Sequence, residues 1–191
     1  MTRLPELFAT LPAVFAGSCD IARPWTLLDE PMEALLAALP SAEILGRVHP
    51  GAHLVGDRIV IRKGSRIAPG AVVEGPVWIG EDVEVRVGAY LRGGCWVGDG
   101  CVVGANVEMK RAILFPGAHA AHLNYVGDSI LGNDVNLGAG VILSNFRHDG
   151  RSVAIPTGAG HDERLATGKR KLGAILGDGV RWTYAELQAL V

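Results

Sequence analysis

A six-residue period runs through the middle of this 191-residue chain and constrains its fold more than any other feature. An amphipathic helix repeats at 3.6 residues and a half-buried strand alternates, so neither produces a period of six. Glycine and small polar residues fall between the apolar positions, as expected for short strands joined by corners. The apolar residue recurs at ten consecutive steps: Val55, Ile61, Ile67, Val73, Ile79, Val85, Leu91, Val97, Val103 and Met109.

Three such hexapeptides make one triangular coil of about 18 residues, and successive coils stack by parallel strand pairing about 4.8 Å apart. The period therefore predicts an all-β fold, a left-handed parallel β-helix of hexapeptide repeats over residues 44–180. Cys95 and Cys101 fall on a second inward position of the repeat. We expect both to be buried as small hydrophobic residues.

The period stops after Met109 and resumes at Leu131, and a last fragment of it covers residues 176–180. We therefore expect loops at 115–130 and 144–172, and such excursions from a rigid scaffold often carry function. Short helical caps are predicted at both ends, because stacked repeats need a cover. They are an N-terminal helical arm over residues 1–43, with an amphipathic stretch at 27–39, and a helix at 181–191 that starts with the capping box WTYAEL.

Composition excludes several classes of function. The chain has 18 Lys plus Arg against 20 Asp plus Glu, a net charge of -2, which leaves no basic excess for a nucleic acid. An apolar stretch of about 18 residues, the length that spans a membrane, is missing, and Glu6 and Pro12 interrupt the N-terminal run that resembles a secretion signal. Three cysteines without metal spacing predict a reducing cytoplasm.

Two cationic residues are spaced by one whole coil. Arg92 and Lys110 are eighteen residues apart and each follows an inward apolar residue, so they should stack on one face. Two cations in register repel each other unless an anion lies beside them. Glu74, one coil earlier, would make the set an acid–base–base ladder on a solvated face. The alternative is a phosphate site, in which arginine offers a planar fork and lysine a point charge.

His119 and His122 lie three residues apart. Histidine-rich prisms of the γ-carbonic anhydrase type bind zinc between subunits, which makes a metal site the alternative to consider here. The sequence places no third ligand, and the cationic pair and the nearby asparagines suit an anion or a sugar better than a metal hydroxide. We therefore assign no metal.

The run from Ala89 to Asn145, with YLRGG, NVEMK, HAAHLNYVGDSILGNDVNLGAG and SNF, resembles one known family. It is similar to the C-terminal acetyltransferase domain of bifunctional N-acetylglucosamine-1-phosphate uridyltransferase and related sugar-phosphate nucleotidyltransferases, over roughly residues 44–180. The resemblance implies a homotrimer with its active site between neighbouring subunits. It also implies transfer of acetyl from acetyl-CoA, a co-substrate rather than a tightly bound cofactor, to the amine of glucosamine 1-phosphate.

Matched position by position, the resemblance assigns roles to single residues. Arg92 and Lys110 match the residues that hold the sugar phosphate, and His122 matches the general base that takes a proton from the amine. Tyr125 and Asn136 match positions that contact the sugar.

The acyl side of the site is implied in the same way. Asn145 matches a residue near the acetyl group, with a role in catalysis, and the segment from Ser144 onward helps admit CoA. Phe146 stands where the family often has tyrosine. Lys169 and Arg170, in the cluster TGKRK, are candidates for contact with a CoA or nucleotide phosphate in a neighbouring subunit; the alternative is a solvated charge run without a ligand.

Two departures from the family bear on function. The first 45 residues carry neither a phosphate-binding glycine loop nor the length for a nucleotide fold, and the period ends after LGDGV, where the family continues for further coils. We therefore expect a stand-alone acetyltransferase that acts on an amino-sugar phosphate. The alternative is a non-catalytic module that binds a sugar phosphate or sugar nucleotide, or assembles with a separate nucleotidyltransferase.

Overall fold

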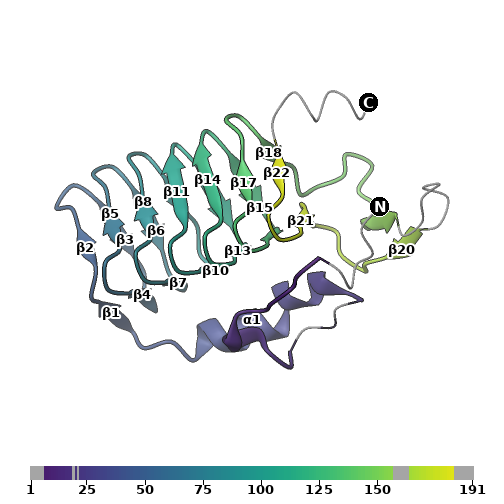
Figure 1. The fold of residues 1–191 in the computed structure, drawn as a ribbon, viewed down its shortest axis with the longest axis horizontal. Helices are drawn as coiled ribbons and strands as arrows, with labels where there is room; N and C mark the ends of the chain where they lie inside the picture. The colour runs from purple at the N-terminus through teal and green to yellow at the C-terminus, as the bar shows by residue number, and fades with distance from the viewer. Residues whose placement is uncertain (1–6, 19, 21, 157–163, 183–191) are drawn as a thin grey trace.

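The computed structural model describes residues 7–18, 20, 22–156 and 164–182. Its main body is a left-handed parallel β-helix, in which three parallel sheets form the faces of a triangular prism (Figure 1). The fold class predicted from the six-residue period is confirmed. We call the three sheets face A, face B and face C.

Every strand of the prism is short, two to four residues, because each one spans a single side of a coil. Face A contains β1 (Ala42–Ile44), β4 (Ile59–Ile61), β7 (Val77–Ile79), β10 (Cys95–Val97), β13 (Ile113–Leu114), β16 (Ile130–Leu131) and β21 (Ile175–Leu176). Face B contains β2 (Arg47–Val48), β5 (Arg66–Ile67), β8 (Glu84–Val85), β11 (Val102–Ala105), β14 (His119–His122), β17 (Asn136–Leu137) and β22 (Arg181–Trp182). Face C contains β3 (His53–Val55), β6 (Val72–Glu74), β9 (Tyr90–Leu91), β12 (Glu108–Lys110), β15 (Tyr125–Gly127) and β18 (Ile142–Leu143).

The inside of the prism is filled by small and branched apolar side chains that stack from coil to coil. Cys95 and Cys101 are among them, both buried and free, as predicted. Burial raises the pKa of each thiol to about 12. Both therefore remain protonated near neutral pH and behave as packing residues.

The loop expected at 115–130 is wrong, because β14, β15 and β16 continue the prism through this segment. Leu91 pairs with Met109, eighteen residues on, whereas Met109 pairs with Val126, only seventeen residues on. One residue is therefore lost at the corner between faces C and A. The loss shifts the phase of the apolar pattern without breaking the stack.

The first step of the period is also corrected. In β3, Leu54 pairs with the buried Val73 and is 36% exposed in this first coil, while Val55 pairs with Glu74 and is 48% exposed. The first coil on this face is one residue longer than the eighteen that the period assumes. Val55 consequently lies outside the core.

The N-terminal arm is helical, as predicted, but it packs along face A rather than on the first coil (Figure 1). It contains the 3-10 helices η2 (Ala13–Phe15) and η3 (Pro24–Leu28) and the helix α1 (Glu30–Ala37), with Pro31 in the first turn of α1. Outward apolar side chains of face A meet the arm, and Phe15 lies edge-on to Trp96 at 5.1 Å between ring centroids. The arm therefore covers one side of the prism.

The chain leaves the prism after β18 and returns at β21, in agreement with the excursion expected at 144–172. The excursion contains a hairpin of β19 (Ala154–Pro156) and β20 (Arg164–Ala166), and Val153 and Leu165 pack with the N-terminal arm. Of the expected C-terminal helix, residues 181 and 182 form β22 and the rest lies outside the described residues. Within the described part, no helix is long and apolar enough to cross a membrane.

Candidate active site

The strongest cluster of functional side chains lies on face C, at its corner with face A. The pairing of Leu91 with Met109 stacks Arg92 and Lys110 on successive coils, and the Arg92 N–H donates to the Met109 carbonyl at 2.9 Å. The eighteen-residue spacing therefore has the structural effect predicted for it.

The acid that contacts Arg92 is not the one that the spacing suggested. Glu74 accepts a hydrogen bond from the Tyr90 hydroxyl at 2.7 Å. Arg92 donates instead to Glu108, which begins β12, at 3.1 Å. Both groups of this ion pair are about 40% exposed, so solvent screens it and the arginine remains available to a ligand.

Lys110 is half-buried and its charged form is disfavoured. Burial is the main cause that lowers the pKa of Lys110 below its ordinary value, and the neighbouring cations Lys171 and Arg92 lower it further, against the opposing effect of Asp128. Lys171 reaches this position from the excursion, where it forms a β-bridge with Phe146. Lys110 therefore lies near two further cations, Arg92 and Lys171, and near the carboxylate of Asp128.

That carboxylate, Asp128, is 5% exposed and connects three parts of the chain. Its Oδ2 accepts a hydrogen bond from the Asn145 side-chain amide, and its Oδ1 lies 3.4 Å from Nε of Arg111. Arg111 in turn donates to the carbonyl of Leu28 in η3 at 3.0 Å. Arg111 and Asp128 both have positive φ, of 45°, at the corner where each coil loses a residue.

Gly127 creates a small space in the middle of this cluster. Gly127 pairs with Lys110, so a side chain here would continue the column of Arg92 and Lys110 on the next coil. A Cβ built on Gly127 would lie 2.6 Å from the Tyr125 hydroxyl and 2.7 Å from Nδ2 of Asn145. The hydroxyl and the amide therefore occupy the space that a side chain would fill. Burial is the main cause that raises the pKa of Tyr125, with Glu108 and Asp128 adding to it.

His122 lies at the opposite edge of face C, at the corner with face B. Its side chain is exposed at the end of β14, and its backbone N–H donates to Oδ1 of the buried Asn124 at 3.1 Å. Leu123, which follows, has a φ of 53° and is 59% exposed. β15 runs from this corner to the corner that holds Gly127, and its three residues span about 10 Å at about 3.3 Å per residue. Within one chain His122 is thus out of hydrogen-bond reach of the cationic cluster.

The remaining candidates are placed apart from one another. Asn136 is half-buried in β17 on face B and pairs with His119 of β14. His119 and His122 lie on one strand rather than on a helix, and among the described residues no group of three potential metal ligands comes together.

The three residues predicted to contact CoA also differ in their surroundings. Phe146 is 47% exposed and lies beside Lys171, while Arg170 is exposed on the excursion. Lys169 forms an ion pair with Asp29 of the N-terminal arm, and its side chain is only 14% exposed. The Lys169 ammonium is thus committed to holding the excursion against the arm.

Sequence reasoning missed Glu108, Gly127, Asp128 and Lys171 as parts of the cluster. Only Lys171 carried a signal, as the last cation of TGKRK. The position of Asp128 depends on the seventeen-residue coil, which the uniform period does not predict.

Comparisons with known proteins place the chain in a family. A family model described as the GMPPB C-terminal domain matches residues 73–183. A bifunctional sugar-1-phosphate nucleotidylyltransferase/acetyltransferase of Sulfurisphaera tokodaii is 36% identical over 162 residues, which cover 85% of this chain and 39% of that protein. The bifunctional protein GlmU of Methanococcus aeolicus is 32% identical over 162 residues, 85% of this chain and 38% of that protein.

Among solved structures, a variant of the GDP-perosamine N-acetyltransferase of Caulobacter crescentus, in complex with CoA and GDP-perosamine, is 18% identical. The match covers 76% of this chain and 51% of that one, with a TM-score of 0.27. The chain spans about two fifths of the two curated relatives named above. The resemblance predicted from residues 89–145 is confirmed by these relatives. Because the family model matches more than half of its length, the chain belongs to the family of the GMPPB C-terminal domain.

Proposed function

We propose that the protein transfers an acetyl group from acetyl-CoA to the amine of an amino-sugar phosphate such as glucosamine 1-phosphate. One observation carries the proposal: Arg92 and Lys110 stack one coil apart, and Lys171 joins them from the excursion. The cluster holds the cations Arg92, Lys110, Lys171 and Arg111 against the carboxylates Glu108 and Asp128. The excess of positive charge that remains is one that a phosphate would neutralise. The acetyltransferase named among the relatives supports the same reaction class.

The sugar would lie against the groups next to the phosphate site. The Tyr125 hydroxyl and the Asn145 amide meet over Gly127, within the same cluster as Lys110. Asn145 is held by its hydrogen bond to Asp128, so its amide is oriented before a ligand arrives. Such orientation reduces the entropy that must be lost when the sugar and the acyl donor meet.

The base must come from a second copy of the chain. His122 and the cationic cluster flank face C at opposite edges, so a neighbouring prism that meets this face would bring its own His122 to the cluster. Large apolar side chains are exposed along these edges, including Leu123 (59%) and Ile142 (54%). A closed ring of three prisms repeats the contact three times, and His122 and Asn136, on neighbouring strands of face B, would complete each site from one side.

In this arrangement the imidazole of His122 takes a proton from the amine as nitrogen attacks the thioester carbonyl. The new C–N bond forms, the C–S bond breaks, and the CoA thiolate leaves and is protonated. An imidazole can accept a proton near neutral pH, and a positioned base of this kind contributes about 100- to 10,000-fold. Phe146 and Arg170 stand on the excursion as contacts for CoA, whereas Lys169 would first have to leave Asp29.

The direct test mixes the protein with acetyl-CoA and glucosamine 1-phosphate and follows the release of free thiol. We expect release that His122→Ala abolishes and that His53→Ala, which removes an exposed histidine on β3 of face C, leaves unchanged. Arg92→Ala should raise the KM for the sugar phosphate more than it lowers kcat.

The shared site has a sharper test in subunit mixing. When His122→Ala and Arg92→Ala chains are unfolded together and refolded, about one quarter of the sites in a random trimer combine an intact His122 with an intact Arg92. Activity should return to about that fraction. At a sugar-phosphate concentration far below the KM of either variant, a mixture of Arg92→Ala with Lys110→Ala should be no more active than either variant alone, because both defects lie in the same half of the site. Equal rescue in both mixtures would contradict the shared site.

A second candidate function, a binding module without catalysis, is favoured by a different observation. The cationic cluster is complete within one chain, whereas His122 is not part of it. Failure to release thiol, together with binding of glucosamine 1-phosphate that Arg92→Ala weakens, would select this function.

A further inference from the structure

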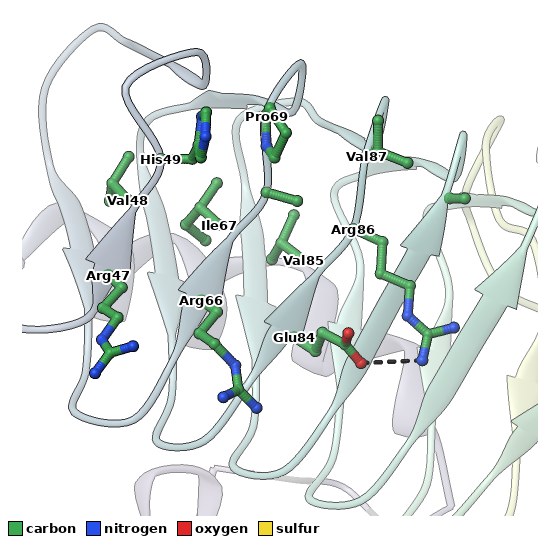
Figure 2. Close-up of a pocket in the computed structure, with 12 residues that line it drawn as sticks. Arg47, Val48, His49, Arg66, Ile67, Pro69, Glu84, Val85, Arg86 and Val87 are labelled. Atoms are coloured by element: carbon green, nitrogen blue, oxygen red, sulfur yellow. Dashed lines mark hydrogen bonds and ion pairs between the residues drawn. The ribbon is translucent and has the colours of Figure 1, made fainter.

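A separate groove of about 700 Å³ lies on face B, over the first coils of the prism. Its floor follows β2, β5 and β8, and Val48, Ile67 and Val85 contribute to its lining (Figure 2). Ala105 of β11 also lines it. The groove is on a different face from the cationic cluster of Arg92 and Lys110, and its size is in the range of small-molecule sites, about 300–1,000 Å³.

One side of the groove carries cations in register. Arg47 and Arg66 are directly paired residues of β2 and β5, and their guanidinium groups lie along the same side in Figure 2. Like charges directly opposite each other on neighbouring strands are destabilising. Neither guanidinium forms an ion pair with another residue that the structure describes. An anion bound between or beside the two guanidinium groups would therefore reduce their repulsion.

The next residues on the same side cancel part of that charge. Glu84 pairs directly with Arg66 in the register of β5 with β8, and it also accepts a hydrogen bond from Arg86 at 2.9 Å. This bond is the main cause that lowers the pKa of Glu84, so the carboxylate is ionised at neutral pH. With Arg47, Arg66 and Arg86 against Glu84, three positive charges face one negative charge, which leaves an excess of two on the groove.

The other side of the groove is mainly apolar. His49, Pro69 and Val87 stand along it in Figure 2, and Val87 is 56% exposed. The His49 ring is fixed by its Nδ1, which accepts the N–H of Gly51 at 3.0 Å. A ligand that fills the groove therefore needs an anionic part for the arginines and a flat, less polar part for this wall.

We propose that the groove binds a nucleoside diphosphate group, with its phosphates along Arg47 and Arg66 and its base against Pro69 and Val87. Inorganic phosphate would use only the cationic side and leave the apolar wall in water. A planar base also offers its ring face to the arginines and to the fixed imidazole of His49. The groove borders the corner that carries His122, because Ala105, which lines it, pairs with His122 of β14. The nucleotide would be a second ligand beside the acetyl acceptor of the proposed function.

The test is calorimetric titration of the whole chain with uridine diphosphate, guanosine diphosphate, inorganic pyrophosphate and uridine. We expect one diphosphate nucleotide to bind per chain. Arg47→Ala and Arg66→Ala should each weaken binding at least about tenfold, since each removes a charge-assisted contact to phosphate. Val87→Asp should weaken the binding of both nucleotides and affect the binding of pyrophosphate less. Arg23→Ala, which removes an exposed arginine on the N-terminal arm, is the matched control and should change nothing.

Three outcomes would overturn the proposal. Pyrophosphate that binds as tightly as the nucleotides would reduce the groove to an anion site, and nucleotide affinity that is unchanged by both arginine variants would place the ligand elsewhere. Absence of binding, with Arg47→Glu or Arg66→Glu changing the oligomeric state, would mean that a second copy of the chain covers the groove. Arg92→Ala and His122→Ala distinguish the two sites, because they should impair acetyl transfer and leave nucleotide binding intact.

Discussion

The side-chain amide of Asn145 donates to the buried carboxylate of Asp128, seventeen residues earlier and one coil away. The same carboxylate faces Arg111, whose guanidinium reaches the N-terminal arm through the carbonyl of Leu28. A residue implied in catalysis is therefore held by a structural ion pair, and the arm, the prism and the excursion meet at one side chain.

Replacement of Asp128 tests this junction. Asp128→Ala leaves Nε of Arg111, which is already buried without a hydrogen-bond partner, without its nearby charge. Because Arg111 is 38% exposed, part of the cost is screened, and we expect the free energy of unfolding to fall by about 1–3 kcal/mol. Urea unfolding measures it. Asp57→Ala, where the carboxylate is 69% exposed and 3.7 Å from Arg58, should cost less than about 0.5 kcal/mol; equal losses would refute the role of Asp128 as a junction.

Gly127→Ala should remove binding of the sugar phosphate with little effect on the fold. The added Cβ would meet the Tyr125 hydroxyl at 2.6 Å and the Asn145 amide at 2.7 Å, so both side chains must move. We expect the Kd for glucosamine 1-phosphate to rise at least about tenfold. The control is Gly51→Ala, whose Cβ would meet its nearest neighbour, the His49 ring, at 3.4 Å. If Gly127→Ala binds normally, the space over Gly127 is not part of the site.

The lowered pKa of Lys110 predicts a pH dependence of phosphate binding. A sugar phosphate is fully ionised above about pH 7, since its second pKa is near 6, so only the protein titrates at higher pH. The ammonium form of Lys110 is lost as pH rises through a pKa that lies below the ordinary 10.5. Affinity should therefore fall at a lower pH than an unperturbed lysine would allow. Lys110→Arg, which stays charged, should remove the decline; a decline that persists would assign it to another group.

Association of the chain can be tested at Leu123 without disturbing its corner. The residue has a φ of 53°, a conformation that asparagine adopts more easily than leucine. Leu123→Asn should therefore keep or slightly raise the stability of one chain while it removes an exposed apolar contact. We expect sedimentation to show a shift from the proposed trimer to the monomer. Leu45→Asn, which is 48% exposed on the first coil, should leave the trimer intact; an unchanged trimer in both would contradict the role of this corner.

The core of the fold could be predicted from the sequence because burial repeats at a fixed interval. Cys95, Cys101 and Met109 are inward, since a uniform six-residue step holds through them. The step fails at Phe115, which faces the N-terminal arm, while Leu114 takes the inward place. A coil shortened by one residue gives no sign in the apolar pattern until the pattern resumes. The sequence alone therefore predicts a loop where the prism continues.

The candidate site was predictable in part. Arg92 and Lys110 lie in the uniform part of the period, so their stacking followed from spacing alone. Lys171 and Asn145 depend on how the excursion folds back, which follows no period. Lys169, which the charge cluster suggested as a ligand contact, is instead paired with Asp29 from a distant part of the chain. Contacts between irregular segments are set by packing that local sequence does not encode.

The short corner at Lys110 to Ala112 has a consequence for how this molecule could be altered. Two successive coils are each one residue shorter at this edge. The side chains inside the prism nevertheless stay aligned from coil to coil. The number of residues at this corner can therefore change without moving the side chains inside the prism. Exposed residues of the corner can be replaced while the fold is kept. Insertion of a single glycine beside Arg111 would restore the longer turn and move the Arg111 guanidinium. The ion pair between Arg111 and Asp128 thus depends on the length of this one corner.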